Sequence, residues 1–183
     1  GDLVPRSLER FHEAVPRISA LTPDEALAQL TAAVEATFAP LIAGDYLVLG
    51  WQSRWLAKLP AYLDWQRQRE AEGWFWHSAE TVLNRRFPLE GPLAGQTLEL
   101  IGRADRVDYH PADDHFALLD YKTRSRKALQ DGLADDVQLA AYGLMSSSER
   151  PAGEAAYVAV DEIPIATVAI DDLPAAAAQE ERR

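Results

Sequence analysis

The sequence contains no cysteine among its 183 residues. This absence excludes disulfide bonds, thiolate zinc sites and cysteine-held iron–sulfur clusters. No apolar run approaches the roughly 20 residues that a transmembrane helix needs, and the N-terminus shows no signal-peptide pattern. We therefore expect a protein of a bacterial-type cytoplasm, without a membrane partner.

Positive charge is also scarce, because 18 Lys and Arg residues stand against 29 Asp and Glu residues, a formal net charge of -11. This balance argues against a protein that coats nucleic acid with its surface. It leaves room for an enzyme that contacts a few phosphates locally. Hydrophobic residues make up 48% of the chain, whose length is sufficient for one domain with a substantial core.

The order of the apolar patterns predicts helices first and strands afterwards. Helical spacing covers residues 1–15, 22–42 and 46–72, with a capping box formed by Thr22 and Glu25, and a break at Pro60. A short strand, a hairpin over residues 98–123, a helix and another strand pair follow. We expect one α/β domain with a central mixed sheet flanked by helices, divided into a helical part (1–76) and a sheet-bearing core (77–170).

The hairpin brings two carboxylates together. With the turn between Ala112 and Asp113, antiparallel pairing places Asp105 opposite Asp120, on the face that also carries Lys122. At an effective dielectric constant of 20, two such charges repel by about 3–4 kcal/mol. A divalent cation relieves this repulsion, and oxygen ligands suit Mg²⁺ or Mn²⁺. The alternative is a surface hairpin held by cross-strand salt bridges.

Two further features favour a catalytic site. A lysine beside a metal ion can orient water and stabilise developing negative charge, as metal-assisted hydrolysis of a phosphodiester requires. In the helix that follows, Gln138 and Tyr142 are four residues apart and therefore share one face. This pair forms a hydrogen-bonding stripe, either at the same site or as the polar edge of a packed helix.

Taken together, the segments IGRADRVD, LLDYKT and VQLAAYG resemble the PD-(D/E)XK nucleases of the RecB-like branch, whose pattern runs G-x-x-D-R-x-D, D-Y-K-T and Q-x-x-x-Y. The similarity extends to the C-terminal nuclease domains of AddB-type DNA repair proteins. It implies a restriction-endonuclease-like fold and a metal-dependent DNA nuclease, of exonuclease type, in DNA repair and recombination. The missing initiator Met and the Ala-rich end agree with a fragment of a longer protein.

The resemblance implies a role for each matching residue. Asp105 and Asp120 would bind Mg²⁺ or Mn²⁺, together with the main-chain carbonyl of Tyr121. Lys122 would position or activate the attacking water, and Glu80 matches an acidic position before the first motif strand. The catalytic set implied by the resemblance is Asp105, Asp120, Lys122, Gln138 and Tyr142.

Polar residues near the proposed site are candidates for DNA contacts. We select Arg103, Arg106, Thr123 and Arg124, with ordinary solvated charge as the alternative. The resemblance implies single-stranded DNA ends and a helicase domain or subunit as partners, and the lack of cysteine places the chain among relatives without an iron–sulfur cluster. A set of aromatic residues could stack on single-stranded bases or belong to a core: Trp51, Trp55, Tyr62, Trp65, Trp74 and Trp76.

One position departs from the family pattern. Relatives begin with a helix of the form G-x-x-x-H, whose His contributes to the metal site, and this chain has Pro5 there. His12 lies seven residues further on, about 10.5 Å along a helix, which is too far for a simple replacement. An alternative is therefore a catalytically impaired nuclease-like domain that binds DNA or scaffolds a helicase–nuclease complex. A plain protein-interaction domain is a third hypothesis.

Overall fold

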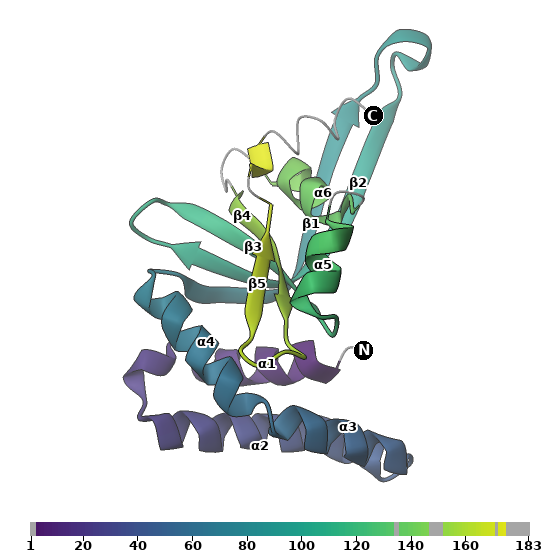
Figure 1. Cartoon of the computed structure of the whole chain (residues 1–183). Coiled ribbons are helices and arrows are strands. Elements are labelled where there is room, and N and C mark those ends of the chain that lie inside the picture. Colours follow the sequence, from purple (N-terminus) through teal and green to yellow (C-terminus); the bar gives the residue numbers. More distant parts are fainter. Residues whose placement is uncertain (1–2, 134–135, 147–151, 171, 175–183) are drawn as a thin grey trace.

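The computed structural model describes residues 3–133, 136–146, 152–170 and 172–174 (Figure 1). Its helices are α1 (Leu3–Ala14), α2 (Pro23–Ile42), α3 (Tyr46–Leu56), α4 (Leu59–Ala71), α5 (Arg126–Gly132) and α6 (Gln138–Met145), with 3₁₀ turns at Ile18–Ala20 and Gly91–Leu93. Its strands are β1 (Phe75–Pro88), β2 (Thr97–His110), β3 (His115–Lys122), β4 (Ala152–Ala159) and β5 (Ala166–Ala169). Within these ranges, no helix has the length and apolarity needed to cross a membrane.

Local sequence signals set the helix boundaries. The Thr22 hydroxyl accepts a hydrogen bond from the Glu25 main-chain N, and the Glu25 carboxylate accepts one from the Thr22 main-chain N, so the predicted capping box is confirmed. The predicted break is also confirmed, because Pro60 lies in the first turn of α4, where its missing N–H costs no helical hydrogen bond. Gly73 follows the helical region with a φ of 92°, a left-handed conformation that favours glycine.

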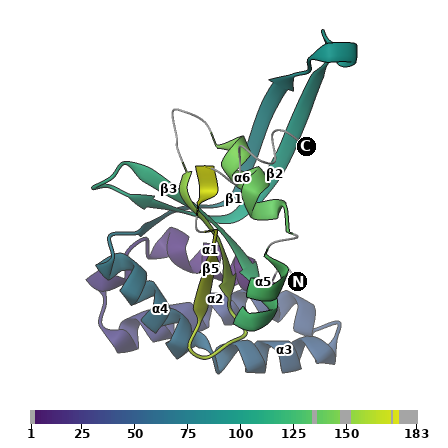
Figure 2. The same ribbon diagram turned by 45° about the horizontal axis from the view of Figure 1, so that its top comes forward.

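The strands form one mixed sheet in the order β1-β2-β3-β4-β5, with β3 and β4 parallel and the other neighbours antiparallel. Between β2 and β3, Arg106 pairs with Leu119 and His110 with His115, which confirms the predicted hairpin register. β1 is longer than the short strand that we expected. Its distal half pairs with β2 to form an arm, residues 82–103, that projects from the sheet (Figure 1, Figure 2).

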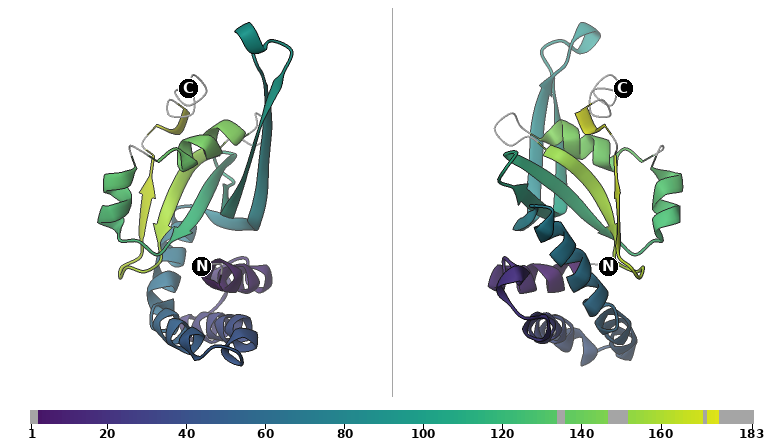
Figure 3. Two further views of the ribbon diagram at one scale, coloured as in Figure 1. Left: turned by 90° about the vertical axis from the view of Figure 1, so that its right-hand side faces the viewer. Right: turned by 60° about the vertical axis from the view of Figure 1, so that its left-hand side comes forward.

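Helices cover both faces of the sheet. The first four lie below it, and α5 and α6 lie on the opposite side (Figure 1, Figure 3). Alternating side chains of β3 divide between the two layers: Leu119 belongs to the hydrophobic cluster of the first four helices, and Leu118 to that of α5 and α6. The expected mixed sheet flanked by helices is therefore confirmed, and it is consistent with a restriction-endonuclease-like fold.

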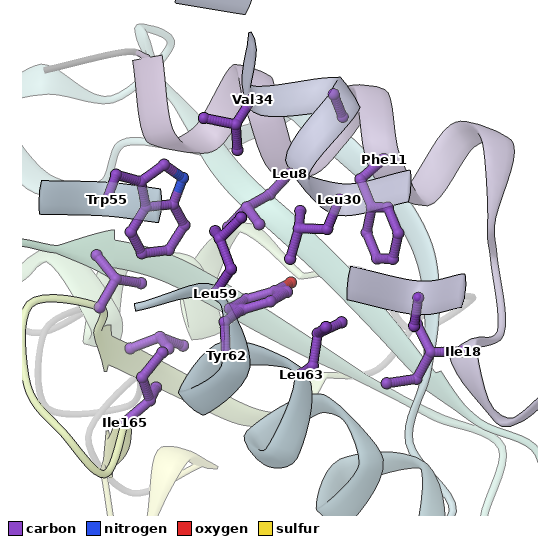
Figure 4. Packing of buried hydrophobic residues seen from close by; sticks show 14 of the residues in the cluster. Leu8, Phe11, Ile18, Leu30, Val34, Trp55, Leu59, Tyr62, Leu63 and Ile165 are labelled. Atoms are coloured by element: carbon purple, nitrogen blue, oxygen red, sulfur yellow. The ribbon is translucent and has the colours of Figure 1, made fainter. Parts of the chain in front are cut away.

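The larger hydrophobic cluster lies between the first four helices and the sheet (Figure 4). Leu8 of α1, Leu30 of α2 and Leu59 of α4 are buried there. Two members of the aromatic set, Trp55 and Tyr62, are also buried in this core, so they are not available to stack on bases. Residues on four separate helices thus bury one shared apolar surface, which stabilises the helical layer on the sheet.

A buried ion network ties this helical layer to the sheet. Arg106 Nε donates to Asp108 over 2.6 Å, and Arg106 Nη1 donates to the Tyr62 hydroxyl over 2.8 Å. Arg69 of α4 donates to the other Asp108 oxygen over 2.8 Å and to Glu154 of β4 over 3.0 Å. Arg106 and Asp108 are 1% and 0% exposed. These charges are tolerated in the interior because each has an opposite partner within hydrogen-bonding distance.

We predict that Asp108→Ala is strongly destabilising. The substitution leaves two buried guanidinium groups without their shared carboxylate, and such a loss typically costs about 3–5 kcal/mol. Urea unfolding would measure the change in the free energy of unfolding. Asp64→Ala is the matched control, because the Asp64 side chain is exposed and 3.8 Å from Arg67, and we expect it to cost less than about 1 kcal/mol. Equal losses in the two variants would contradict the prediction.

Candidate active site

Two carboxylates meet where β2 and β3 separate. The ladder between these strands ends at the pair Arg106–Leu119, next to Asp105 on one strand and Asp120 on the other. Beyond it, Asp105 Oδ2 accepts a hydrogen bond from the Tyr121 main-chain N over 2.9 Å. Asp105 is half-buried and Asp120 is buried. The structure thus brings the two predicted carboxylates to one point at the end of the ladder.

Asp120 is surrounded by hydrogen-bond donors. Lys122 Nζ lies 2.6 Å from Asp120 Oδ2, and Gln138 Nε2 donates to Oδ1 over 2.7 Å. The Tyr142 hydroxyl lies 3.2 Å from Oδ1 and donates to the main-chain carbonyl of Arg103 over 2.7 Å. Helix α6 supplies the second and third of these side chains, because residues four apart share a helix face. Bonds to a charged acceptor are stronger than neutral ones, so this shell fixes the carboxylate.

Gln138 is hydrogen-bonded at both ends of its amide. Its Nε2 donates to Asp120 and, over 2.8 Å, to the Tyr142 hydroxyl. Its Oε1 accepts from Lys122 Nζ over 3.1 Å and from the Tyr157 hydroxyl over 3.3 Å. Both N–H groups and both lone pairs are therefore in use, and this arrangement assigns the orientation of the amide. Gln138 consequently links the lysine to the carboxylate.

Tyr157 is a site residue that the sequence analysis missed. It lies on β4 directly beside Asp120 of the parallel strand β3. Its ring centroid is 4.9 Å from Lys122 Nζ, a cation–π distance, while its hydroxyl contacts Gln138. Burial and a hydrogen bond to Asp136 raise the pKa of Tyr157, which keeps the hydroxyl protonated. The segment AAYVAV indicates only a buried strand, and the pairing of β3 with β4 is needed to find this residue.

The surroundings of Asp105 disfavour its ionised form, which would add a second negative charge beside Asp120. Burial and the Asp120 carboxylate raise the pKa of Asp105 to about 6, and the charge of Glu80 adds to this shift. The hydrogen bond from the Tyr121 main-chain N and the charge of Lys122 act in the opposite direction. Like charges in such proximity are what a bound cation would neutralise.

The donor set fits a hard divalent cation. Within the described residues, no group of three His, Cys, Asp or Glu side chains is arranged to bind a metal ion. Mg²⁺, however, is commonly bound through one or two carboxylates and keeps several water ligands. The paired oxygens of Asp105 and Asp120 and the raised pKa of Asp105 are compatible with such an ion. Asp105 and Asp120 are therefore the residues that would hold Mg²⁺ or Mn²⁺.

Pro5, the position at which the resemblance leads us to expect a histidine, lies in the first turn of helix α1. His12 lies in the interior, where its Nε2 is 2.7 Å from the Tyr62 hydroxyl. Burial and the charge of Arg106 lower the pKa of His12 well below its usual value, so the ring is neutral. Glu9, one turn after Pro5, interacts with the charge of Glu80, and burial is the main cause that raises the pKa of Glu9.

The residues selected for DNA contacts divide into two groups. Arg103 is largely exposed and forms an ion pair with Glu80 over 3.0 Å. Thr123 and Arg124 are exposed directly after β3, close in sequence to Lys122. Arg106, in contrast, is buried in the ion network on the other face of the sheet and is closed to phosphates. The prediction that Arg106 contacts DNA is therefore wrong, because Asp108 and the Tyr62 hydroxyl hold its guanidinium group in the interior.

A model of the PD-(D/E)XK nuclease superfamily matches residues 1–183, the whole length of the chain. The chain belongs to this superfamily, and nuclease activity is the function that the superfamily implies. No curated protein matches the sequence. The more specific resemblance to the RecB-like branch and to AddB-type proteins stays a prediction.

We predict that Asp105→Asn makes the folded protein more stable above pH 6. The pKa of Asp105 is raised from its ordinary value of 3.8 to about 6, so between these pH values the folded state binds the proton more tightly than the unfolded chain. Stability is therefore lost as pH rises through this window, and the loss continues until the pH is well above 6. We expect Asp105→Asn to gain about 1–2 kcal/mol at pH 8 and less at pH 4.5.

Urea unfolding at both pH values would test this prediction. Asp64→Asn is the control, because the Asp64 side chain is 82% exposed, and it should change stability equally little at both values. A wild-type protein more stable than Asp105→Asn at pH 8 would show that the carboxylate is not destabilising in the fold.

Proposed function

We propose that this domain is a metal-dependent DNA nuclease that hydrolyses phosphodiester bonds in DNA repair or recombination. The observation that carries the proposal is the convergence of Asp105, Asp120 and Lys122 where β2 and β3 separate. A Mg²⁺ or Mn²⁺ ion bound by the two carboxylates and the Tyr121 main-chain carbonyl would polarise the phosphate and activate water.

Lys122 supplies a fixed positive charge beside the carboxylate pair. Asp120, Gln138 and the ring of Tyr157 hold its ammonium group on three sides. In this position it can donate a hydrogen bond to an attacking water or to a phosphate oxygen. A donor placed in advance stabilises the negative charge that develops in the transition state without reorganisation during the reaction.

Gln138 and Tyr142 hold the carboxylate in place. Both are hydrogen-bonded to Asp120 Oδ1, which restrains the rotation of this carboxylate about its side-chain bonds. Loss of this positioning would lower the reaction rate strongly, because even small displacements of reacting groups do so. These two residues therefore act through Asp120 rather than on the substrate.

Exposed polar residues beside the site would contact the DNA backbone. Arg103, Thr123 and Arg124 can bind phosphates, and phosphate contacts position a nucleic acid without reading its sequence. Single-stranded DNA ends, a helicase domain or subunit as partner, exonuclease action and a bacterial cytoplasmic location are part of the proposal. Their support is the order and spacing of the D-Y-K-T and Q-x-x-x-Y segments.

We predict metal-dependent cleavage of end-labelled linear DNA. The wild-type chain should cut single- or double-stranded substrates in Mg²⁺ or Mn²⁺ and not in EDTA. Asp120→Ala and Lys122→Ala should each lower the rate by about 10²–10³-fold or more, the usual cost of removing one electrostatic contact to the transition state. Asp113→Ala, in the exposed turn of the same hairpin, is the matched control and should keep the wild-type rate.

Two results would contradict a competent nuclease. Salt-dependent DNA binding without cleavage by the wild-type chain would indicate an impaired nuclease-like domain. Recovery of metal-dependent cleavage in Pro5→His would then identify Pro5 as the cause. A chain that neither binds nor cuts DNA would favour a protein-interaction domain.

We predict that Tyr157 acts by positioning Lys122 and Gln138. Tyr157→Phe keeps the ring and removes the hydroxyl with its contacts to Gln138 and Asp136, so we expect kcat to fall by about 3–10-fold or more with an unchanged KM. Tyr157→Leu also removes the cation–π contact and should lose more. Thermal melting of each variant separates this effect from unfolding. A change in KM alone would assign Tyr157 to substrate binding instead.

A further inference from the structure

A pocket lies on the sheet face that carries the carboxylate pair. Its volume is about 200 Å³. Val107, Leu118 and Met145 line it and are buried, so they form its apolar floor. His77 and Phe116 also line it, and their rings are 5.3 Å apart at an angle of 69°.

The pocket lies next to the candidate active site along β2 and β3. Val107 follows Asp105 by two residues on β2, and Leu118 precedes Asp120 by two residues on β3. Val107 and Leu118 pair directly across the ladder. Two residues along a strand span about 7 Å, so the pocket floor begins one such step from the carboxylates. Met145 comes three residues after Tyr142 on α6, so the same helix borders both.

The lining suits a planar heteroaromatic group. An apolar floor beside an edge-to-face pair of aromatic rings favours contact with a flat ring system. The hydroxyl groups of Ser78 and Thr81, which are 2.8 Å apart, add a few hydrogen-bonding groups at the edge. Pockets that combine an apolar surface with few polar groups are typical of specific small-ligand sites. The proposed function places a phosphate beside this pocket, and a nucleotide, whose sugar joins a flat base to a phosphate, is the ligand class that would reach both.

We propose that this pocket is a nucleobase subsite, which holds the base of the nucleotide adjacent to the phosphate at Asp105 and Asp120. This inference rests on the proposed function, which identifies the phosphate-bearing strand as DNA. A domain with this subsite binds an unpaired base, because a base inside a duplex stack has no free face that could contact His77 and Phe116.

Met145 provides a direct probe, because it is the single methionine of the sequence. We would label its methyl group with ¹³C and titrate the chain in EDTA with deoxyadenosine or with deoxyribose 5-phosphate. The ring current of a bound base should shift the Met145 methyl signal with deoxyadenosine and leave it unchanged with deoxyribose 5-phosphate. Equal shifts with both compounds, or no shift with either, would overturn the subsite.

Variants of the pocket walls extend this test to DNA. A short single-stranded oligonucleotide should bind about 5- to 100-fold more tightly than the same strand with abasic residues, the range expected for stacking of a base. His77→Ala and Phe116→Leu should reduce this ratio, and His115→Ala should not, since His115 is exposed on β3 outside the pocket lining. A ratio that falls equally in the control would overturn the assignment.

These binding experiments test the subsite independently of the nuclease proposal. The binding measurements need neither metal nor cleavage. Metal-dependent cleavage without a base-dependent Met145 shift would overturn the subsite alone. A base-dependent shift in a chain that does not cut DNA would support the subsite and contradict the nuclease.

Discussion

The separation of β2 from β3 after the pair Arg106–Leu119 is the constraint on which the site depends. At this point the Tyr121 main-chain N donates to the Asp105 side chain. On the opposite face, Arg106 Nη1 lies 3.4 Å from the Tyr121 hydroxyl and Arg106 Nε is ion-paired with Asp108. Neighbouring residues of a strand therefore lie on opposite faces of the sheet. The carboxylates lie on one face, and the buried ion network lies on the other. Packing of the helical layer thereby fixes where the carboxylates meet.

Helix α6 completes the site only because it lies close to β2. A Cβ atom at Gly102 would be 2.5 Å from Met145 Cε, so the flexible end of the Met145 side chain would have to shift. The Tyr142 hydroxyl bonds the Arg103 main-chain carbonyl, which ties α6 to β2. Gln138, one turn earlier, then reaches Asp120.

The sequence predicts those features that local rules determine. The capping box at Thr22 follows from the residue pattern of a helix start. The placement of Asp105 opposite Asp120 follows from the position of the hairpin turn. Arg106 shows where such rules end. An arginine is typically a surface residue, and the burial of Arg106 depends on Tyr62, 44 residues away in sequence. Tyr157 was missed for the same reason, because the parallel pairing of β3 with β4 is not visible in either segment.

The absence of a histidine at Pro5, where the predicted RecB-like resemblance expects one, bears on the chemistry offered to a cation. With Asp105, Asp120 and a main-chain carbonyl as the ligands that we propose, the set contains oxygen alone, and imidazole-preferring ions such as Zn²⁺ gain no advantage. Fewer protein ligands leave more positions to water, which suits Mg²⁺ because it gives up its water reluctantly. The ionised form of Asp105 is costly without a cation, since burial and Asp120 raise its pKa. Cation binding and ionisation of Asp105 are therefore coupled, and each favours the other.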